Sequence, residues 1–382
     1  MRTSTRGAVA PFIVMDVMEA ARRAEATGRR IIHMEVGQPG TPAPAGARAA
    51  LARALDIDPL GYTVALGLPE LRAGIAALYR RRHGIDIAPE RVVVTAGASG
   101  AFQLAFIALF ETAARVGIGL PGYPSYRHIL QALGLTPVTF ETGAAARFQP
   151  TAADLAKLGK LDGLLVASPA NPSGTMLDRA ALTALIDACA ATGTAFISDE
   201  IYHGLTYGPD PAVSALEITD DVYVINSFSK YHSMTGWRIG WMVVPEGHVR
   251  QVERLAQNLF ICPSHAAQVA ALAALDCEDE LDGLRAVYAR NRDILLDGLP
   301  KAGLSRIAPP DGAFYIYADV SEMTEDSPAL AAGILDQAGV AVTPGVDFDP
   351  ARGHHWLRFS YARTTEDIEE GLARLQSWAA QR

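Results

Sequence analysis

Residues 163–198 read GLLVASPANPSGTMLDRAALTALIDACAATGTAFIS and carry the clearest signal of the fold. The stretch opens with a short apolar run at 163–167 and continues through a polar turn into apolar residues at helical spacing over 178–191. A second apolar run follows at 194–198. Short, continuously apolar strands that alternate with helices are typical of a parallel sheet covered on both faces. The stretch therefore predicts one strand–helix–strand unit of such a sheet.

The same alternation extends on both sides of this unit, from about residue 67. A helix is predicted over 68–79, and further strands are predicted at 91–95, 116–120, 137–140, 222–226 and 239–244. The pattern changes after about residue 285, where helices at 284–299 and 328–338 accompany strands at 313–318, near 340 and at 356–361. We therefore expect an α/β protein with a mostly parallel sheet and a smaller α+β domain near the C-terminus.

Composition excludes several classes of function. The chain has 382 residues and a formal net charge of −9, and its only basic cluster is RRR at 80–82, so a nucleic-acid partner is not expected. Cys189, Cys262 and Cys277 form no CxxC pair and have no histidine at ligand spacing. We therefore expect neither a disulfide framework nor a metal site, and these features are typical of a cytoplasmic enzyme.

Two apolar segments resemble targeting or membrane signals. Residues 8–15 follow Arg2 and Arg6 and resemble a weak signal peptide, but Pro11 interrupts the run and Asp16 ends it. Residues 101–110 form the longest other candidate, which is about half of the ~20 residues that a spanning helix needs. We expect a buried helix there, no membrane partner, and a cytoplasmic location.

The run GIGLPG at 117–122 matches the dinucleotide-binding pattern G-x-G-x-x-G, with Glu141 at about the distance of a ribose-binding acid. That pattern requires a helix to begin directly at the glycine turn. Here the glycines lie inside or just after a predicted strand, and Pro121 and Pro124 flank the turn. A strand and turn that contain glycine are the better interpretation.

Three loops after predicted strands hold side chains suited to chemistry. NSFSKYHSMTGWRIG at 226–240 contains Lys230, with Arg238 eight residues later. SDEIY at 198–202 places Asp199 at the end of an apolar run, and SPANPSGT at 168–175 supplies Asn171. By composition alone the lysine-containing run is also typical of a solvated loop. However, open α/β sheets bind ligands at the carboxyl ends of their strands, so we expect the three loops to share one site.

Together these motifs resemble the class I and II aminotransferases of the pyridoxal-phosphate fold type I superfamily, and the aspartate aminotransferase branch in particular. The similarity runs from GQPG at 37–40 to WLR at 356–358, and includes PGYPSY at 121–126, NPSGT at 171–175, DEIY at 199–202 and SFSK at 227–230. The resemblance implies a large cofactor domain at 46–284 with a mostly parallel, seven-stranded-type sheet. It also implies a small α+β domain built from both chain ends, with 1–45 joining 285–382.

The resemblance implies a ping-pong transfer of an amino group between an amino acid and a 2-oxo acid. Lys230 would form the Schiff base (internal aldimine) with pyridoxal 5'-phosphate and move the proton of the substrate, since this chemistry needs an amine on a flexible stem. Asp199 would keep the pyridine nitrogen protonated by raising its pKa. Tyr202 and Asn171 would donate to the phenolic oxygen, and Lys230, Asp199 and Tyr202 are the expected catalytic residues.

The phosphate of this cofactor needs several donors and a cation. By resemblance, its ligands are the side chains of Ser227, Ser229 and Arg238 and the backbone amides of Gly97, Ala98 and Ser99. These amides open a predicted helix, where free N–H groups and the helix dipole favour an anion.

By the same resemblance, further contacts are expected with the pyridine ring of the cofactor, with a neighbouring subunit and with the substrate. Tyr123 would stack on the pyridine ring, and Tyr62 would reach the phosphate of a neighbouring subunit, which implies a homodimer with shared active sites. Arg358 would hold the substrate α-carboxylate bidentately, with Gly37 contacting the same group. Arg363 is an alternative that follows the strand.

The sequence leaves the substrate and one competing reaction open. In dicarboxylate-specific members of the family a cation often lies near the loop that corresponds to residues 257–267, and this sequence has no Lys or Arg there, which weakens an aspartate assignment. By the same resemblance the apolar residues 11–14 would line the substrate entrance, which favours neutral side chains. A β-eliminating carbon–sulfur lyase needs Lys230, Asp199 and Arg358 equally, so it remains an alternative. A cofactor-sensing regulator would need a DNA-binding module, and the residues before Gly37 are too few for one.

Overall fold

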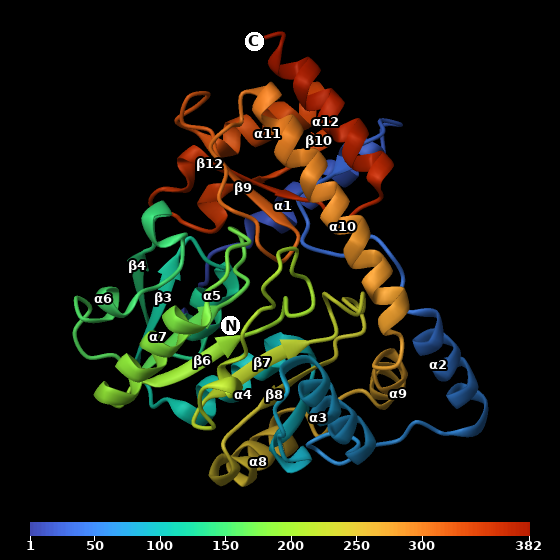
Figure 1. The fold of residues 1–382 in the computed structure, drawn as a ribbon, viewed down its shortest axis with the longest axis vertical. Coiled ribbons are helices and arrows are strands. Elements are labelled where there is room, and N and C mark those ends of the chain that lie inside the picture. The colour runs from blue at the N-terminus through green and yellow to red at the C-terminus, as the bar shows by residue number, and fades with distance from the viewer.

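A twisted seven-stranded sheet forms the centre of the larger part of the protein in the computed structural model, which describes residues 1–382 (Figure 1). In spatial order its strands are β2 (Val92–Thr95), β8 (Gly240–Val243), β7 (Tyr223–Ser227), β6 (Ala195–Asp199), β5 (Gly163–Ala167), β3 (Arg115–Leu120) and β4 (Thr136–Glu141). Strand β8 runs antiparallel to both of its neighbours, β2 and β7, and all other pairs in the sheet are parallel. The predicted α/β class and the mostly parallel seven-stranded sheet are confirmed.

The strands β2, β8, β7, β6 and β5 are buried on both faces of the sheet, because successive residues along each of them enter different hydrophobic cores. Leu164 and Val166 of β5 belong to one core, and Leu165 between them belongs to the other. The first core is covered by α3 (Pro69–His83), α7 (Arg179–Thr192) and α9 (His265–Ala274), and the second by α4 (Gly97–Leu109), α5 (Pro124–Ala132) and α8 (Val249–Leu259). This explains why the strands are continuously apolar rather than alternating.

The smaller part contains residues from both ends of the chain, drawn in blue and in orange to red in Figure 1. Its antiparallel sheet has the order β11 (Thr343–Pro344), β12 (Trp356–Ser360) and β9 (Tyr315–Asp319). A second, parallel pair joins β1 (Ile32–His33) to β10 (Val340–Ala341). The expected small α+β domain built from both ends is therefore present.

Helices cover these small sheets and connect them to the larger part. They are α1 (Ile13–Glu25), α10 (Glu278–Gly298), α11 (Ser327–Ala338) and α12 (Thr365–Ala379), while α2 (Ala45–Ile57) and α6 (Ala152–Leu155) lie on the larger part. The predicted helix at 284–299 begins earlier than expected, because Glu278, Asp279 and Glu280 form an acidic first turn that suits a helix N-terminus. Since α10 runs through residue 284, the domain division at residues 45 and 284 stays a prediction.

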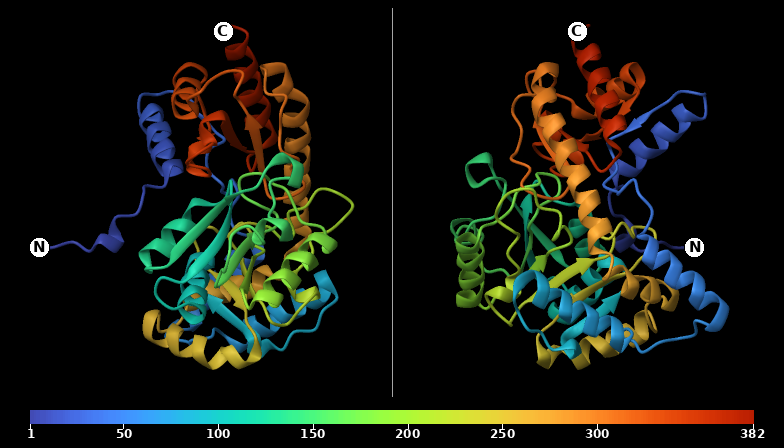
Figure 2. Two further views of the ribbon diagram at one scale, coloured as in Figure 1. Left: turned by 90° about the vertical axis from the view of Figure 1, so that its left-hand side faces the viewer. Right: turned by 45° about the vertical axis from the view of Figure 1, so that its right-hand side comes forward.

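Two further features concern the surface of the fold. Residues 1–11 are exposed, and the left view of Figure 2 shows them extending away from the body of the molecule. None of the helices is both long enough and apolar enough to cross a membrane.

Candidate active site

A cavity of about 340 Å³ lies at the carboxyl ends of β6 and β7, between the two parts of the molecule. Ligand pockets of small-molecule enzymes begin at roughly 300 Å³. The predicted site residues that line it are Gly37, Ala98, Ser99, Tyr123, Asn171, Asp199, Tyr202, Ser229, Lys230, Arg238 and Arg358. The three loops singled out in the sequence therefore do meet at one place.

Lys230 follows β7 and projects its amine into this cavity. Its Nζ donates a hydrogen bond to the carbonyl oxygen of Gly37 at 2.6 Å, and lies 5.9 Å and 5.8 Å from the ring centroids of Tyr202 and Phe314. Burial, together with the positive charges of Arg358 and Arg238, lowers the pKa of Lys230 to about 8. A lysine of this kind is partly uncharged near neutral pH, which is what a nucleophilic amine requires.

Asp199 is the last residue of β6 and is only 3% exposed. Its carboxylate accepts hydrogen bonds from the hydroxyl of Tyr126 and from the backbone N–H of Ile201, the latter at 3.1 Å. Burial raises the pKa of Asp199 to about 6, and the two hydrogen bonds oppose that rise. A cationic ring nitrogen placed against this carboxylate would supply the charge that the buried group lacks.

An anion cradle is formed by the start of α4 together with Ser229 and Arg238. The first N–H groups of an α-helix have no intrahelical partner, and those of Ala98 and Ser99 line the cavity. Gly97 has φ +68°, and a Cβ at this position would lie 2.5 Å from Nη2 of Arg238. Glycine at 97 therefore leaves room for the guanidinium beside the helix end.

Three of the predicted phosphate ligands do not line the cavity: Gly97, Ser227 and Tyr62. The Oγ of Ser227 lies 2.8 Å from Oγ of Ser229 and 3.0 Å from the carbonyl oxygen of Ile239, so it orients Ser229. Tyr62 lies on the surface and is 84% exposed, which makes it the one exposed tyrosine of the chain.

Arg358 lies on β12 at the opposite wall and is 2% exposed. Its Nη1 donates to Oδ1 of Asn171 at 2.9 Å, and its Nη2 donates to the carbonyl oxygen of Glu35. The guanidinium lies 4.4 Å and 4.7 Å from the ring centroids of Tyr315 and Phe348, and its buried Nε has no hydrogen-bond partner. A buried cation with an unused donor suits a carboxylate ligand.

Arg363, the alternative to Arg358, points elsewhere. Its Nε donates to the carbonyl oxygen of His33 at 3.2 Å, and the residue does not line the cavity. Gly37 lies where a Cβ would collide with the hydroxyl of Tyr315. The cavity therefore requires glycine at position 37 for reasons of space.

Several lining residues received no role in the sequence analysis. Tyr126 donates to Asp199, and the hydroxyls of Tyr202 and Tyr315 lie 2.8 Å apart. Tyr126 could have been found as the last residue of PGYPSY, but Tyr315 follows no motif and is brought in by β9 from the far end of the chain. Phe12 and Val14 come from the apolar run 11–14, and the remaining additions are Met15, Val36, Gln38, Phe102, Ile201 and Thr235.

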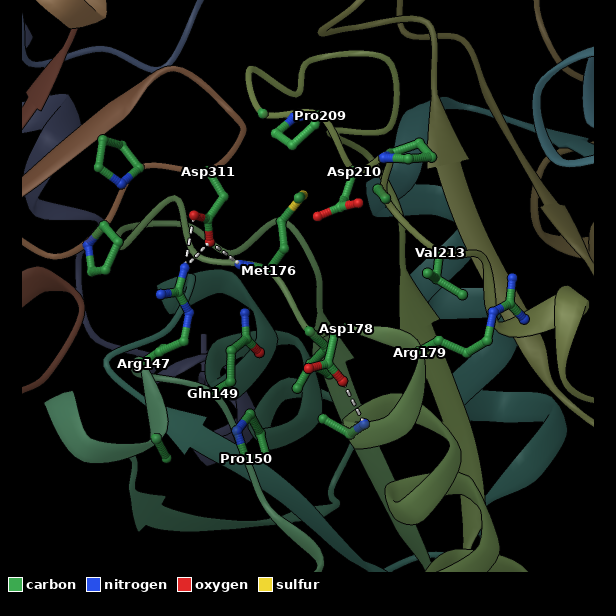
Figure 3. A pocket seen from close by; sticks show the side chains of 18 of the residues that line it. Arg147, Gln149, Pro150, Met176, Asp178, Arg179, Pro209, Asp210, Val213 and Asp311 are labelled. Carbon is green, nitrogen blue, oxygen red and sulfur yellow. Dashed lines mark hydrogen bonds and ion pairs between the residues drawn. The ribbon is translucent and has the colours of Figure 1, made fainter.

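A larger hollow of about 1360 Å³ lies outside this site, beside α6 and α7 (Figure 3). Most of its charged groups are already paired: Arg147 donates to both carboxylate oxygens of Asp311, and Arg179 binds Glu217, while Asp210 is the exception. Asp178 accepts from the N–H of Ala181 and caps α7. The hollow therefore shows no set of free groups aimed at a ligand.

Taken together, the residues that line the 340 Å³ cavity fit pyridoxal 5'-phosphate. They offer a pKa-lowered amine, a buried carboxylate, an anion cradle at a helix N-terminus and a buried guanidinium with an unused donor. These match the aldehyde, ring nitrogen and phosphate of the cofactor and the carboxylate of an amino acid, respectively. Nothing in the cavity conflicts with this assignment.

Comparisons with known proteins agree with the geometry. The sequence model of the family described as aminotransferase class I and II matches residues 29–375. A valine–pyruvate aminotransferase from Mycobacterium tuberculosis is 49% identical over 99% of this chain and 98% of its own length. A solved structure from Silicibacter pomeroyi is 64% identical, with a TM-score of 0.95 and full coverage of both chains. The aspartate aminotransferase of Thermus thermophilus solved with maleate is 30% identical, with a TM-score of 0.92, and covers 99% of this chain and 100% of its own.

Proposed function

The chain belongs to the class I and II aminotransferase family and is an aminotransferase, and on this premise we propose that it moves amino groups between neutral, apolar amino acids and 2-oxo acids. Members of this family depend on pyridoxal 5'-phosphate, and the reaction is a ping-pong exchange in which one 2-oxo acid leaves before the next enters. The observation that carries the proposal is the Lys230 amine, which lies in one cavity with Asp199 and Arg358.

We assign the cofactor contacts residue by residue. Lys230 would bind the aldehyde carbon covalently, Asp199 would face the pyridine nitrogen, and Tyr123 would pack on the ring. The cradle formed by Gly97, Ala98, Ser99, Ser229 and Arg238 would hold the phosphate, with Ser227 behind Ser229. Asn171 and Tyr202 would donate to the phenolic oxygen. When bound, the cofactor supplies an electron sink for the electron pair of the substrate α-carbon.

The side chains divide the work of the reaction among them. Arg358 fixes the α-carboxylate, so that the α-hydrogen faces Lys230. The Nζ of Lys230 would accept that proton when it is not bound to the cofactor, because its lowered pKa makes the amine partly neutral. Asp199 would hold the ring nitrogen in its protonated form.

The cavity favours a substrate with a neutral side chain. Its three cations, Lys230, Arg238 and Arg358, all have assigned partners, which leaves none for a second carboxylate. Phe12, Val14 and Met15 add an apolar wall. The related Mycobacterium tuberculosis protein is named for valine and pyruvate, which agrees with this choice.

A homodimer is part of the proposal. Tyr62 is 84% exposed, and Ile57, Val64, Leu259 and Ile261 are also exposed large apolar residues. Exposed apolar patches of this kind mark interaction surfaces. We propose that a second copy covers them, and that Tyr62 of each copy reaches the phosphate of the other. The three free cysteines agree with a cytoplasmic enzyme.

The test is a panel of donors and acceptors with purified holoenzyme. Valine, leucine, alanine, aspartate and glutamate are each offered with pyruvate or 2-oxoglutarate, and the keto-acid product is measured. We expect valine, leucine and alanine to react faster than the two dicarboxylates. Failure of every donor, or a clear preference for aspartate, would contradict the proposal. A cysteine-type substrate is offered separately without an acceptor, and release of pyruvate and ammonia from it would indicate the β-eliminating carbon–sulfur lyase, which none of the named relatives supports.

A further inference from the structure

Helix α1 supplies an apolar wall of the cavity, yet its N-terminus lacks a cap of its own. The residue at the N-cap position is Phe12, whose side chain cannot accept a hydrogen bond from the first turn. Phe12 and Val14 line the cavity, and the ring of Phe12 packs edge-on against Tyr123 at 5.7 Å. The position of this helix end therefore sets the shape of the cavity on that side.

A residue from the other end of the chain supplies the missing cap. Oδ1 of Asp347 accepts from the backbone N–H of Ile13 at 3.1 Å, and Oδ2 accepts from that of Val14 at 3.3 Å. Asp347 is only 3% exposed. A carboxylate at a helix N-terminus satisfies free N–H groups and interacts favourably with the helix dipole.

The loop that carries Asp347 is itself held on two sides. The guanidinium of Arg127, on α5, donates to the carbonyl oxygens of Asp347 at 3.1 Å and Phe348 at 3.2 Å. The Phe348 ring lies 4.7 Å from the guanidinium of Arg358. The same short loop thus contacts the larger part, the substrate arginine and the start of α1.

The rest of α1 is attached by little buried surface. Its buried core consists of Ala21 with Ile31 and Ala341, and of its other residues only Val14 is buried. With so small a core, the two hydrogen bonds to Asp347 are a substantial part of what holds the helix end in place.

We propose that Asp347 is a positioning residue for substrate selection: by capping α1 it holds Phe12, Val14 and Met15 against the side chain of a large apolar amino donor. This inference rests on the proposed function, because it takes the cavity as the amino-acid site. Alanine shares the ammonium and carboxylate of such a donor but hardly reaches the wall. Loss of the cap therefore affects leucine and valine more than alanine.

The test compares Asp347→Ala and Asp347→Asn with Asp349→Asn in the holoenzyme. Asp349 is equally buried in the same loop, but it accepts from the N–H groups of Ala351 and Arg352 and does not contact α1. In Asp347→Ala we expect kcat/KM for leucine, divided by that for alanine, to fall about tenfold, since part of a side chain's burial is lost. Asp347→Asn keeps one hydrogen-bond acceptor, so we expect a smaller fall of this ratio. Asp349→Asn should keep the wild-type ratio.

Hydrogen exchange provides a second readout that does not depend on activity. Amides at the start of α1 should exchange faster in Asp347→Ala than in the wild type and in Asp349→Asn. Phe12→Ala should lower the leucine-to-alanine ratio without any change at Asp347, and the double variant should lower it no further than the more affected single variant does.

Two results would overturn the inference: unchanged exchange at the start of α1, or an equal loss of activity for leucine and alanine. The second result would mean that Asp347 supports the fold in general. If the wild type transaminates no donor, the proposed function fails while the exchange experiment still answers whether Asp347 caps the helix.

Discussion

The Nζ of Lys230 and the carbonyl oxygen of Gly37 lie 2.6 Å apart, although the two residues are separated by 193 positions in the chain. This hydrogen bond joins the end of β7 to the N-terminal segment that enters the small part. It also holds the amine toward the cavity, beside Asp199 and Arg358. The reactivity of the site therefore depends on how this one amine is positioned and charged.

Replacement of Lys230 by alanine should remove both the covalent attachment of the cofactor and the proton transfer. We expect kcat to fall by at least about 10²-fold, the lower limit for a positioned acid–base group. The visible absorbance of the lysine-bound cofactor should disappear as well. Lys157→Ala is the control, because Lys157 is exposed on the larger part. Full turnover by Lys230→Ala would remove this residue from its assigned role.

The rate at which the cofactor attaches to the apoenzyme should depend on the protonation state of Lys230. Only the neutral amine attacks an aldehyde, so the rate should rise with pH and reach half of its maximum near pH 8 rather than near 10.5. Arg358→Gln removes a positive charge that lowers this pKa, and should move the midpoint upward. Arg363→Gln, outside the cavity, should leave it in place. Stopped-flow absorbance measures the rate, and a midpoint above 10 in the wild type would contradict the assignment.

Asp199→Asn should retain the cofactor but lose most of the activity. An amide cannot balance a protonated ring nitrogen, so the electron sink weakens, and we expect kcat to fall at least about 100-fold. Glu200→Gln is the matched control. Glu200 is buried like Asp199, but it accepts from Ser214 and the N–H of Ala215, away from the cavity. Equal losses in the two variants would show that the effect is one of stability.

Gly97→Ala should weaken binding of the phosphate group. The new Cβ would displace the guanidinium of Arg238, and φ +68° strains any residue with a side chain. We expect the Kd of pyridoxal 5'-phosphate to rise about tenfold or more, which corresponds to roughly 1.4 kcal/mol. Gly236→Ala should change it little, because a Cβ there meets no atom within 4 Å. Equilibrium dialysis of the two apoenzymes measures the Kd of pyridoxal 5'-phosphate. Equal Kd values for the two variants would mean that the phosphate does not bind beside Gly97.

Tyr62 should act on the other subunit. Tyr62→Phe removes a hydroxyl that we assign to the partner's phosphate, and the cofactor Kd should rise about tenfold. Tyr62→Phe and Lys230→Ala proteins are mixed and allowed to exchange subunits at limiting cofactor. Each mixed dimer then has one complete site, in which Lys230 comes from one subunit and Tyr62 from the other. Activity should exceed that of either variant alone. A monomer in sedimentation experiments, or no gain on mixing, would contradict shared sites.

Much of the larger part could be predicted from sequence, for a physical reason. A strand covered on both faces must be apolar at every position, and this is visible locally; β5 occupies the predicted residues 163–167. The loops after β5, β6 and β7 could be placed together because parallel strands end at the same edge.

The other contributions to the site depend on contacts between distant residues. Tyr315 reaches Tyr202 because β9 packs against the larger part, and Asp347 reaches Ile13 because β11 lies beside α1. Neither residue belongs to a motif, since nothing in the local sequence requires a tyrosine or an aspartate there. Tyr62 is a different case: its expected partner belongs to another chain, so the isolated fold leaves it on the surface.

The parallel pair of β1 with β10 has a consequence for how the protein is made. Ile32 pairs with Val340, and Ile13 and Asp347 are bonded across 334 positions. A ribosome releases the N-terminal segment early, while its partners are still to be translated. The sheet at 92–243 and its helices can form first, but β1 cannot pair until β10 has been translated. Newly made chains should therefore pass through a stage in which the larger part is folded and the amino-terminal segment is still open to proteases.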